Sequence, residues 1–214
     1  MLFRDRVEAG RRLATELMKF RGDDVVVVGI PRGGVVVANE VAKALGAPLD
    51  IVVTRKIGAP GNPEFALGAV TQEGEVIMDW KAAESLGASR AYLDEEVRMK
   101  RDQVKERMDN LRGKVPYPLL EGKTVIIVDD GIATGSSVEA AVISVRRRNP
   151  KSIVVAVPVA PSESVERLSK GVAEVVCLER PWGFLAIGEF YRDFGQVEDS
   201  EVRRILEDNL AGRQ

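Results

Sequence analysis

Short runs of β-branched residues recur along this chain, and segments with the apolar spacing of helices separate them. This alternation constrains the fold most, because strand, helix and strand in succession form a parallel pair in one sheet. The runs are continuously apolar, as is typical of strands buried on both faces. We therefore predict an α/β fold, a mostly parallel twisted sheet flanked by helices. Its predicted strands are DDVVVV (23–28), LDIVVTRK (49–56), TVIIV (124–128), SIVVAVPVA (152–160) and AEVVCLE (173–179).

Residues 58–113 interrupt the alternation and are predicted to form a flexible insertion, a hairpin followed by helices. The hairpin is expected around Glu73 and Gly74. The long helix from Arg90 to Arg112 is rich in charges, which favours a solvated face, and a lid or a dimer contact is the alternative. A chain of 214 residues can bury one large core, so a single domain over 1–214 is predicted.

The composition excludes several kinds of site. The chain has no histidine and one cysteine, Cys177, so it lacks Ser-His and Cys-His catalysis, histidine metal sites and an intramolecular disulfide. Cys177 is expected to be a buried small hydrophobe. The formal net charge of -2 offers no general attraction to nucleic acid or to a membrane surface. Neither a secretory segment nor a run of transmembrane length occurs, so the cytoplasm is the expected compartment.

Two acids and a loop of small, hydroxylated residues follow the strand TVIIV in the segment VDDGIATGSS. The N–H groups of such a loop and a helix that begins near Gly135 can cradle a phosphate. Asp129 and Asp130 suit hydrogen bonds from sugar hydroxyls, or the support of Mg²⁺ through water. The alternative is that both acids are turn and capping residues. The residues predicted to hold a 5-phosphate are Gly131, Ala133, Thr134, Gly135, Ser136 and Ser137.

Basic residues follow two other predicted strands. In GIPRGG, Arg32 lies among glycines and a proline, where its guanidinium and nearby N–H groups can bind a diphosphate. A tight turn between strand and helix is the alternative. In TRK, Arg55 and Lys56 end a strand, and a solvated basic pair is the alternative. Ligands of open parallel sheets gather at the carboxyl ends of the strands, so the three segments together suit a ribose that carries a 5-phosphate and a 1-diphosphate.

The chain resembles the type I phosphoribosyltransferases, in which a hydrophobic strand, two acids and a Thr-Gly-x-Ser/Thr loop bind phosphoribosyl diphosphate (PRPP). VIIVDDGIATGSS carries this resemblance most specifically, PRGG is similar to the family's pyrophosphate loop, and TRK is similar to the strand end before its mobile catalytic loop. From residue 3 to about 206 the chain also resembles a bacterial and archaeal subgroup of unassigned substrate, through FRDR, RKIGAPGNPEFALGAV, VDDGIATG and YRDFGQV.

This resemblance implies transfer of ribose 5-phosphate from PRPP to a nitrogenous base, with release of diphosphate. Mg²⁺ is the implied cofactor, held mainly by substrate oxygens, and no residue is assigned as a direct metal ligand. The insertion at 58–113 would cover the site, and a homodimer is implied. The residues implied as catalytic are Asp129, Asp130, Arg32 and Lys56. Those implied for the diphosphate are Arg32, Gly33, Arg55 and Lys56, with a cis peptide bond between Arg32 and Gly33.

The acceptor is less defined. The resemblance implies a C-terminal hood at 178–198, in which Phe184 or Trp182 would stack on the base, and ordinary packing explains these rings equally well. Purine-salvage members carry a lysine after the strand that follows the acids. Pro158 and Val159 occupy that stretch here, which disfavours hypoxanthine and guanine.

Two other classes of function fit the same residues. A regulator could sense PRPP or a nucleotide on this fold while binding RNA or DNA, and it should show a continuous basic face. An interaction module that has lost catalysis is the second. The intact segments DDGIATGSS and TRK favour the enzyme over that module.

Overall fold

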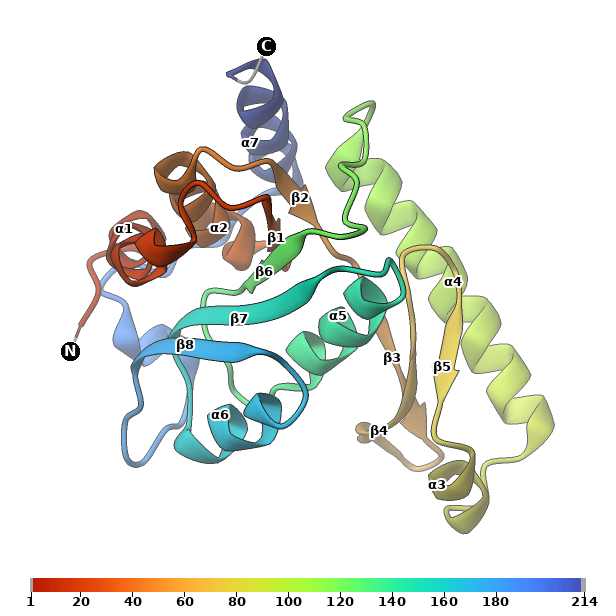
Figure 1. The fold of residues 1–214 in the computed structure, drawn as a ribbon. Coiled ribbons are helices and arrows are strands. Elements are labelled where there is room, and N and C mark those ends of the chain that lie inside the picture. Colours follow the sequence, from red (N-terminus) through yellow and green to blue (C-terminus); the bar gives the residue numbers. More distant parts are fainter. Residues whose placement is uncertain (1, 213–214) are drawn as a thin grey trace.

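The computed structural model describes residues 2–212, except the side chain of Glu64. A five-stranded parallel sheet lies at its centre (Figure 1). Gly29 lies level with Ile51 and with Val128, so three strand ends share one edge. The predicted α/β fold class is thereby confirmed. In the spatial order β2-β1-β6-β7-β8, the strands are β2 (Leu49–Ile51), β1 (Val25–Gly29), β6 (Thr124–Val128), β7 (Ser152–Val159) and β8 (Glu174–Glu179).

Helices cover both faces of this sheet because its strands are apolar on both sides (Figure 1). Along β1, Val27 faces one core and Val26 and Val28 face the other. The helices on the first face are α1 (Arg6–Leu17), α2 (Gly33–Leu45) and α7 (Asp199–Ala211). Those on the second face are α5 (Ser136–Arg146) and α6 (Ser162–Ser169). Short 3₁₀ turns are η1 (Met18–Phe20) and η2 (Ile187–Phe190).

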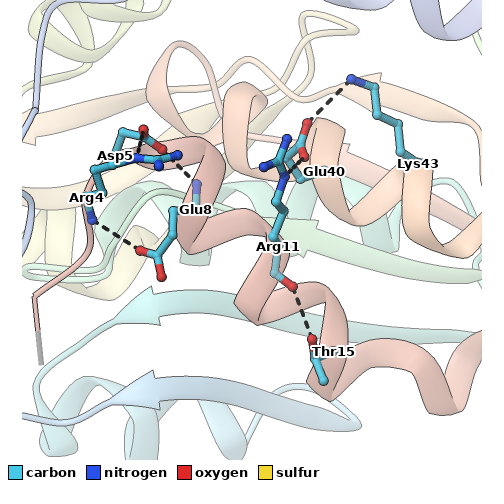
Figure 2. A network of polar contacts seen from close by, with 7 residues as sticks. All are labelled: Arg4, Asp5, Glu8, Arg11, Thr15, Glu40 and Lys43. Atoms are coloured by element: carbon cyan, nitrogen blue, oxygen red, sulfur yellow. Dashed lines mark hydrogen bonds and ion pairs between the residues drawn. The ribbon is translucent and has the colours of Figure 1, made fainter.

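The first turn of α1 is fixed by a reciprocal cap (Figure 2). Asp5 Oδ1 accepts a hydrogen bond from the N–H of Glu8 at 2.8 Å, and Glu8 Oε2 accepts one from the N–H of Arg4 at 3.2 Å. Further along α1, Arg11 Nε donates to Glu40 Oε2 on α2 at 2.9 Å (Figure 2). The cap thus fixes where α1 begins, and the Arg11–Glu40 pair links α1 to α2.

A second, antiparallel sheet and two helices form an arm beside the parallel sheet (Figure 1). At the turn before its last strand, Gly74 has a φ of 79° and donates to Thr71 O at 2.9 Å, so the predicted hairpin around Glu73 and Gly74 is confirmed. In the spatial order β3-β4-β5, the strands of the arm are β3 (Arg55–Ala59), β4 (Asn62–Val70) and β5 (Val76–Met78). Its helices are α3 (Trp80–Ser85) and α4 (Arg90–Arg112).

The strand predicted over 49–56 is wrong in its second half. β2 ends at Ile51, and its ladder with β1 closes where the N–H of Val52 donates to Gly29 O at 3.1 Å. β1 itself ends at Gly29, because the chain turns there toward α2, so β2 has no neighbour along which to continue. Arg55 and Lys56 instead begin β3 of the arm.

Two further observations concern the sequence expectations. Cys177, expected to be buried, is half-buried on β8, and burial raises the pKa of its thiol. No helix within residues 2–212 has the length and apolar character needed to span a membrane.

Candidate active site

The two acids and the glycines of PRGG lie in contact at the carboxyl edge of the sheet. Asp129 and Asp130 follow β6, and the first turn of α2 packs against them. A Cβ on Gly34 would lie 2.7 Å from Asp129 Oδ1, and one on Gly33 would overlap the Asp130 carboxylate. Glycine at both positions therefore permits this approach. Two segments that are almost a hundred residues apart in the sequence thus form one surface.

Asp130 is held by an arginine that the sequence analysis did not single out. Arg6 Nε, in the first turn of α1, donates to Asp130 Oδ2 at 2.7 Å, and the two side chains are only 12% and 13% exposed. Arg6 also donates to Gly195 O at 2.8 Å, and its guanidinium lies 3.8 Å from the centroid of the Phe194 ring. The hydroxyl of Tyr191 donates to Asp130 O at 2.6 Å. Asp130 is thus enclosed by both ends of the chain.

The segments FRDR and YRDFGQV meet to form this enclosure. The N–H of Phe3 donates to Phe190 O at 2.7 Å, and the N–H of Arg192 donates to Phe3 O at 2.8 Å. Phe3 and Tyr191 pack with ring centroids 5.4 Å apart. The only sequence signal for this contact was that both phrases belong to the subgroup resemblance, and nothing in their spacing pairs them.

Asp129 differs from Asp130 in its electrostatics. Burial raises the pKa of Asp129 well above its ordinary value, and the neighbouring Asp130 charge raises it further. Its Oδ1 accepts a hydrogen bond from the N–H of Asp130 at 2.9 Å. Among residues 2–212 Asp129 forms no ion pair, whereas Asp130 has Arg6. Asp130 is therefore paired with a cation of the fold, whereas the surroundings of Asp129 favour its neutral form.

Helix α6 supports the loop after the acids. Ser164 Oγ donates to Ala133 O at 3.1 Å, and the Arg167 guanidinium donates to Thr134 O while it pairs with Glu139 at 2.6 Å. Gly135, with a φ of 84°, caps α5 without a side-chain hydrogen bond. The first N–H groups of α5, beginning at Ser136, are thus available to an anion.

Gly131 lies against the C-terminal segment of the chain. A Cβ there would lie 2.6 Å from Ile187 Cγ2 on η2, so the glycine allows the C-terminal segment to pack onto the loop. Ala133 and Thr134 are exposed, and Thr134 Oγ1 lies 3.3 Å from Ser136 Oγ. The hydroxyl groups of the loop are therefore gathered at its outer end.

A cleft of about 80 Å³ joins this loop to two basic residues. Its walls include Pro31, Arg55, Arg107 and Ser137. Arg55, at the start of β3, and Ser137, at the start of α5, thus face one space, although they are 82 positions apart. Arg107, on α4, is a further candidate for the site, and no sequence pattern distinguished it from the many other charges of that helix.

Arg32 follows Pro31 of this cleft, whereas Lys56 lies in a separate one. Arg32 is the N-cap of α2, and one of its guanidinium nitrogens lies 3.7 Å from Asp199 Oδ1. Lys56 lines a second cleft of about 230 Å³ between the arm and α5, together with Ser136 and Glu139. Neighbouring residues of a strand point to opposite sides, which accounts for the separation of Lys56 from Arg55.

A cis peptide bond precedes α2, and two aromatic rings lie in the predicted hood. The cis peptide bond lies between Pro31 and Arg32, so the expectation of a cis bond between Arg32 and Gly33 is wrong by one residue. Phe184 stacks on Phe190, with ring centroids 5.4 Å apart and planes 15° apart. Trp182 is fully exposed. Phe184, one of the two rings predicted to stack on a base, thus packs against another ring of its own segment, while Trp182 is left in solvent.

Known proteins resemble this chain over nearly its whole length. A family model described as the phosphoribosyl transferase domain matches residues 4–191. Two proteins of Mycobacterium tuberculosis, provisionally named as phosphoribosyl transferases, are each 42% identical over 207 residues, which cover 96% of this chain and 46% of theirs. The chain therefore spans about half the length of these curated relatives. A crystal structure from Thermus thermophilus is 48% identical, with a TM-score of 0.89, and covers 97% of this chain and 99% of that one.

Proposed function

The chain belongs to the phosphoribosyl transferase family, a class of pentosyltransferases, and from that premise we propose that it transfers ribose 5-phosphate from PRPP to a nitrogenous base and releases diphosphate. One observation carries this proposal. The acids after β6 contact Gly33 and Gly34, and Pro31 just before them lines one cleft with Arg55 and with Ser137 at the start of α5. A molecule with a diol between two phosphate groups suits that order of donors and acceptors.

The proposed roles follow the charges. Asp129 and Asp130 bind or orient the ribose hydroxyls, and the basic residues neutralise the leaving diphosphate. The transition state of such a transfer resembles an oxocarbenium ion, so catalysis consists of fixing the sugar and stabilising the departing anion. The residues proposed for the 5-phosphate are Gly131, Ala133, Thr134, Gly135, Ser136 and Ser137. Those proposed for the diphosphate are Arg32, Gly33, Arg55 and Lys56, of which Arg32 and Lys56 act in catalysis with the two acids.

Mg²⁺ fits this site only if the substrate supplies most of its ligands. Within the described residues, no three acids, histidines or cysteines gather in a way that would hold a metal ion. Asp130 is already paired with Arg6, which leaves Asp129 as the carboxylate that a hydrated ion could approach. Bound to PRPP, the ion would offset charge on the diphosphate.

The parts around the edge have proposed roles as well. The insertion at 58–113 covers the bound substrate and excludes water, and the hood at 178–198 receives the base beside Phe184 or Trp182. We further propose that residues 1–214 act as one domain, in a homodimer and in the cytoplasm.

The Arg6–Asp130 ion pair favours a second candidate. One of the two acids is already neutralised, which is compatible with a site that senses PRPP or a nucleotide without turnover. Such a protein would bind PRPP with magnesium and release no diphosphate with any base.

Turnover separates these candidates. Diphosphate release from PRPP is measured with a panel of purine, pyrimidine and pyridine bases, for the wild type and for Asp129→Asn. We expect release with at least one base, and its loss in the variant, while circular dichroism shows an unchanged fold. Arg98→Gln is the matched control, because Arg98 lies on the exposed face of α4 and pairs with Glu95. Undiminished release by Asp129→Asn would show that the assigned roles are wrong.

A further inference from the structure

Arg107 differs from Arg90 and Arg98, two other arginines of α4. Arg90 and Arg98 are 76% and 70% exposed and pair with acids of their own helix. The Arg107 side chain is only 23% exposed, and its NH1 donates at 2.8 Å to both carboxylate oxygens of Asp199, at the start of α7. Arg107 thus reaches out of the arm toward the carboxyl edge of the sheet, where it lines the cleft with Arg55 and Ser137.

This cleft carries more positive than negative charge. Arg55 and Arg107 line it, Arg32 follows its wall residue Pro31, and Asp199 pairs with Arg32 and Arg107. Arg55 donates to Thr54 O at 3.2 Å, and among residues 2–212 it pairs with no carboxylate. Burial, and then the nearby charge of Arg107, lower the pKa of Arg55. Two partly buried cations are held close together here, which is costly unless an anion comes between them.

The geometry points to a diphosphate as that anion. We propose that Arg107 binds the diphosphate of PRPP, and that Asp199 is the counter-ion it leaves when the substrate binds. This inference rests on the proposed function, because it names one more residue for the same ligand. A diphosphate has several oxygen acceptors and enough charge to pair with three guanidinium groups, whereas Asp199 offers a single charge. Asp199 is about one-third exposed, so it can turn toward water when Arg107 changes partner.

A purely structural role makes a different prediction. If Arg107 only ties α4 to α7, its loss weakens the fold and affects every ligand alike. If Arg107 meets the diphosphate, its loss affects only ligands that carry one. Ribose 5-phosphate lacks the diphosphate and keeps the rest of the PRPP molecule, so it is the discriminating probe.

The test is calorimetric titration of the full chain with magnesium diphosphate, with PRPP and magnesium, and with ribose 5-phosphate. In Arg107→Gln we expect affinity for diphosphate and PRPP to fall about tenfold or more, since hydrogen bonds between charged groups are lost, and affinity for ribose 5-phosphate to stay unchanged. Asp199→Asn should bind diphosphate about threefold more tightly, because a partly exposed competing ion pair is removed. Arg98→Gln, which removes an equal charge from the same helix, should match the wild type.

Several results would overturn the inference. Wild-type affinity for diphosphate in Arg107→Gln would remove Arg107 from the site, while the proposed function would stand if the wild type binds PRPP. Equal weakening of all three ligands would assign Arg107 to helix docking. Weaker binding by Asp199→Asn would make Asp199 a positioning residue rather than a competitor. Binding of none of the three by the wild type would overturn the proposed function itself. If Arg107→Gln does not fold, the affinities of Arg107→Lys and Asp199→Asn for the same three ligands are compared with those of the wild type.

Discussion

Replacing Arg6 with methionine leaves the Asp130 carboxylate enclosed without its cation. The wild-type pair is short, at 2.7 Å, and both side chains are about seven-eighths buried. Methionine keeps much of the arginine stem, so the packing against Phe194 is largely preserved while the charge is lost. Water cannot fully replace the guanidinium, because the Asp130 side chain is only 13% exposed.

The expected loss follows from this burial. Breaking a buried ion pair by removing one partner costs about 3–5 kcal/mol, because a buried charge is left uncompensated. For a chain of this size, 1 kcal/mol corresponds to about 2–4 °C in Tm, so Arg6→Met should melt roughly 6–20 °C below the wild type. Arg11→Met is the control, since Arg11 is 66% exposed in its pair with Glu40 and should cost less than about 1 kcal/mol.

The assay is urea unfolding followed by circular dichroism, with the double variant Arg6→Met, Asp130→Asn completing a mutant cycle. If the ion pair is the cause, removing the Asp130 charge as well should restore much of the loss, and the two single changes should be strongly non-additive. A loss below about 1 kcal/mol in Arg6→Met, or simple additivity in the cycle, would refute the reasoning.

Two further changes test other carboxylates. Asp129→Asn should raise the free energy of unfolding at neutral pH. Because the pKa of Asp129 is raised in the folded state, folding favours the neutral acid, and the wild type loses stability as pH rises from the ordinary value of 3.8 through the folded pKa. Asparagine does not ionise, so the variant does not lose this stability. Urea midpoints from acid to neutral pH measure this gap, and a gap independent of pH would contradict it. Asp50→Asn should cost about 3–5 kcal/mol in the same assay, because Asp50 is fully buried and pairs with Arg112 and Arg148. A loss no larger than that of Arg11→Met would show that those arginines find other partners.

The parallel sheet could be predicted from local sequence patterns. The runs of valine and isoleucine at β1, β6 and β7 are buried on both sides, and each precedes a helix, so their order and direction were predictable. The rule that ligands gather at the carboxyl edge then brought PRGG to the two acids, which the contact of Gly34 with Asp129 bears out. The end of β2 was not predictable, because it depends on where β1 stops rather than on the residues of β2 itself.

Contacts between side chains that are far apart in the chain could not be predicted from the sequence. Arg6 and Asp130 are 124 positions apart, and Arg107 and Asp199 are 92 apart. Each arginine belongs to a helix with several other charges, and periodicity cannot tell a charge in solvent from one that reaches a neighbouring element. The residues that the sequence did bring out carry local signals, such as paired acids after a strand or glycines in a turn.

The two pairings also explain how opposite charges coexist at one edge. Adjacent carboxylates at Asp129 and Asp130 repel, and Arg6 relieves that repulsion by pairing with Asp130. Asp199, at the start of α7, likewise pairs with Arg32 and Arg107. One acid and two cations are thus compensated by residues of other elements, while Asp129 and Arg55 form no ion pair among residues 2–212. A direct pair between Asp129 and Arg32 or Arg55 would occupy the groups to which we assign the ribose and the diphosphate in the proposed function.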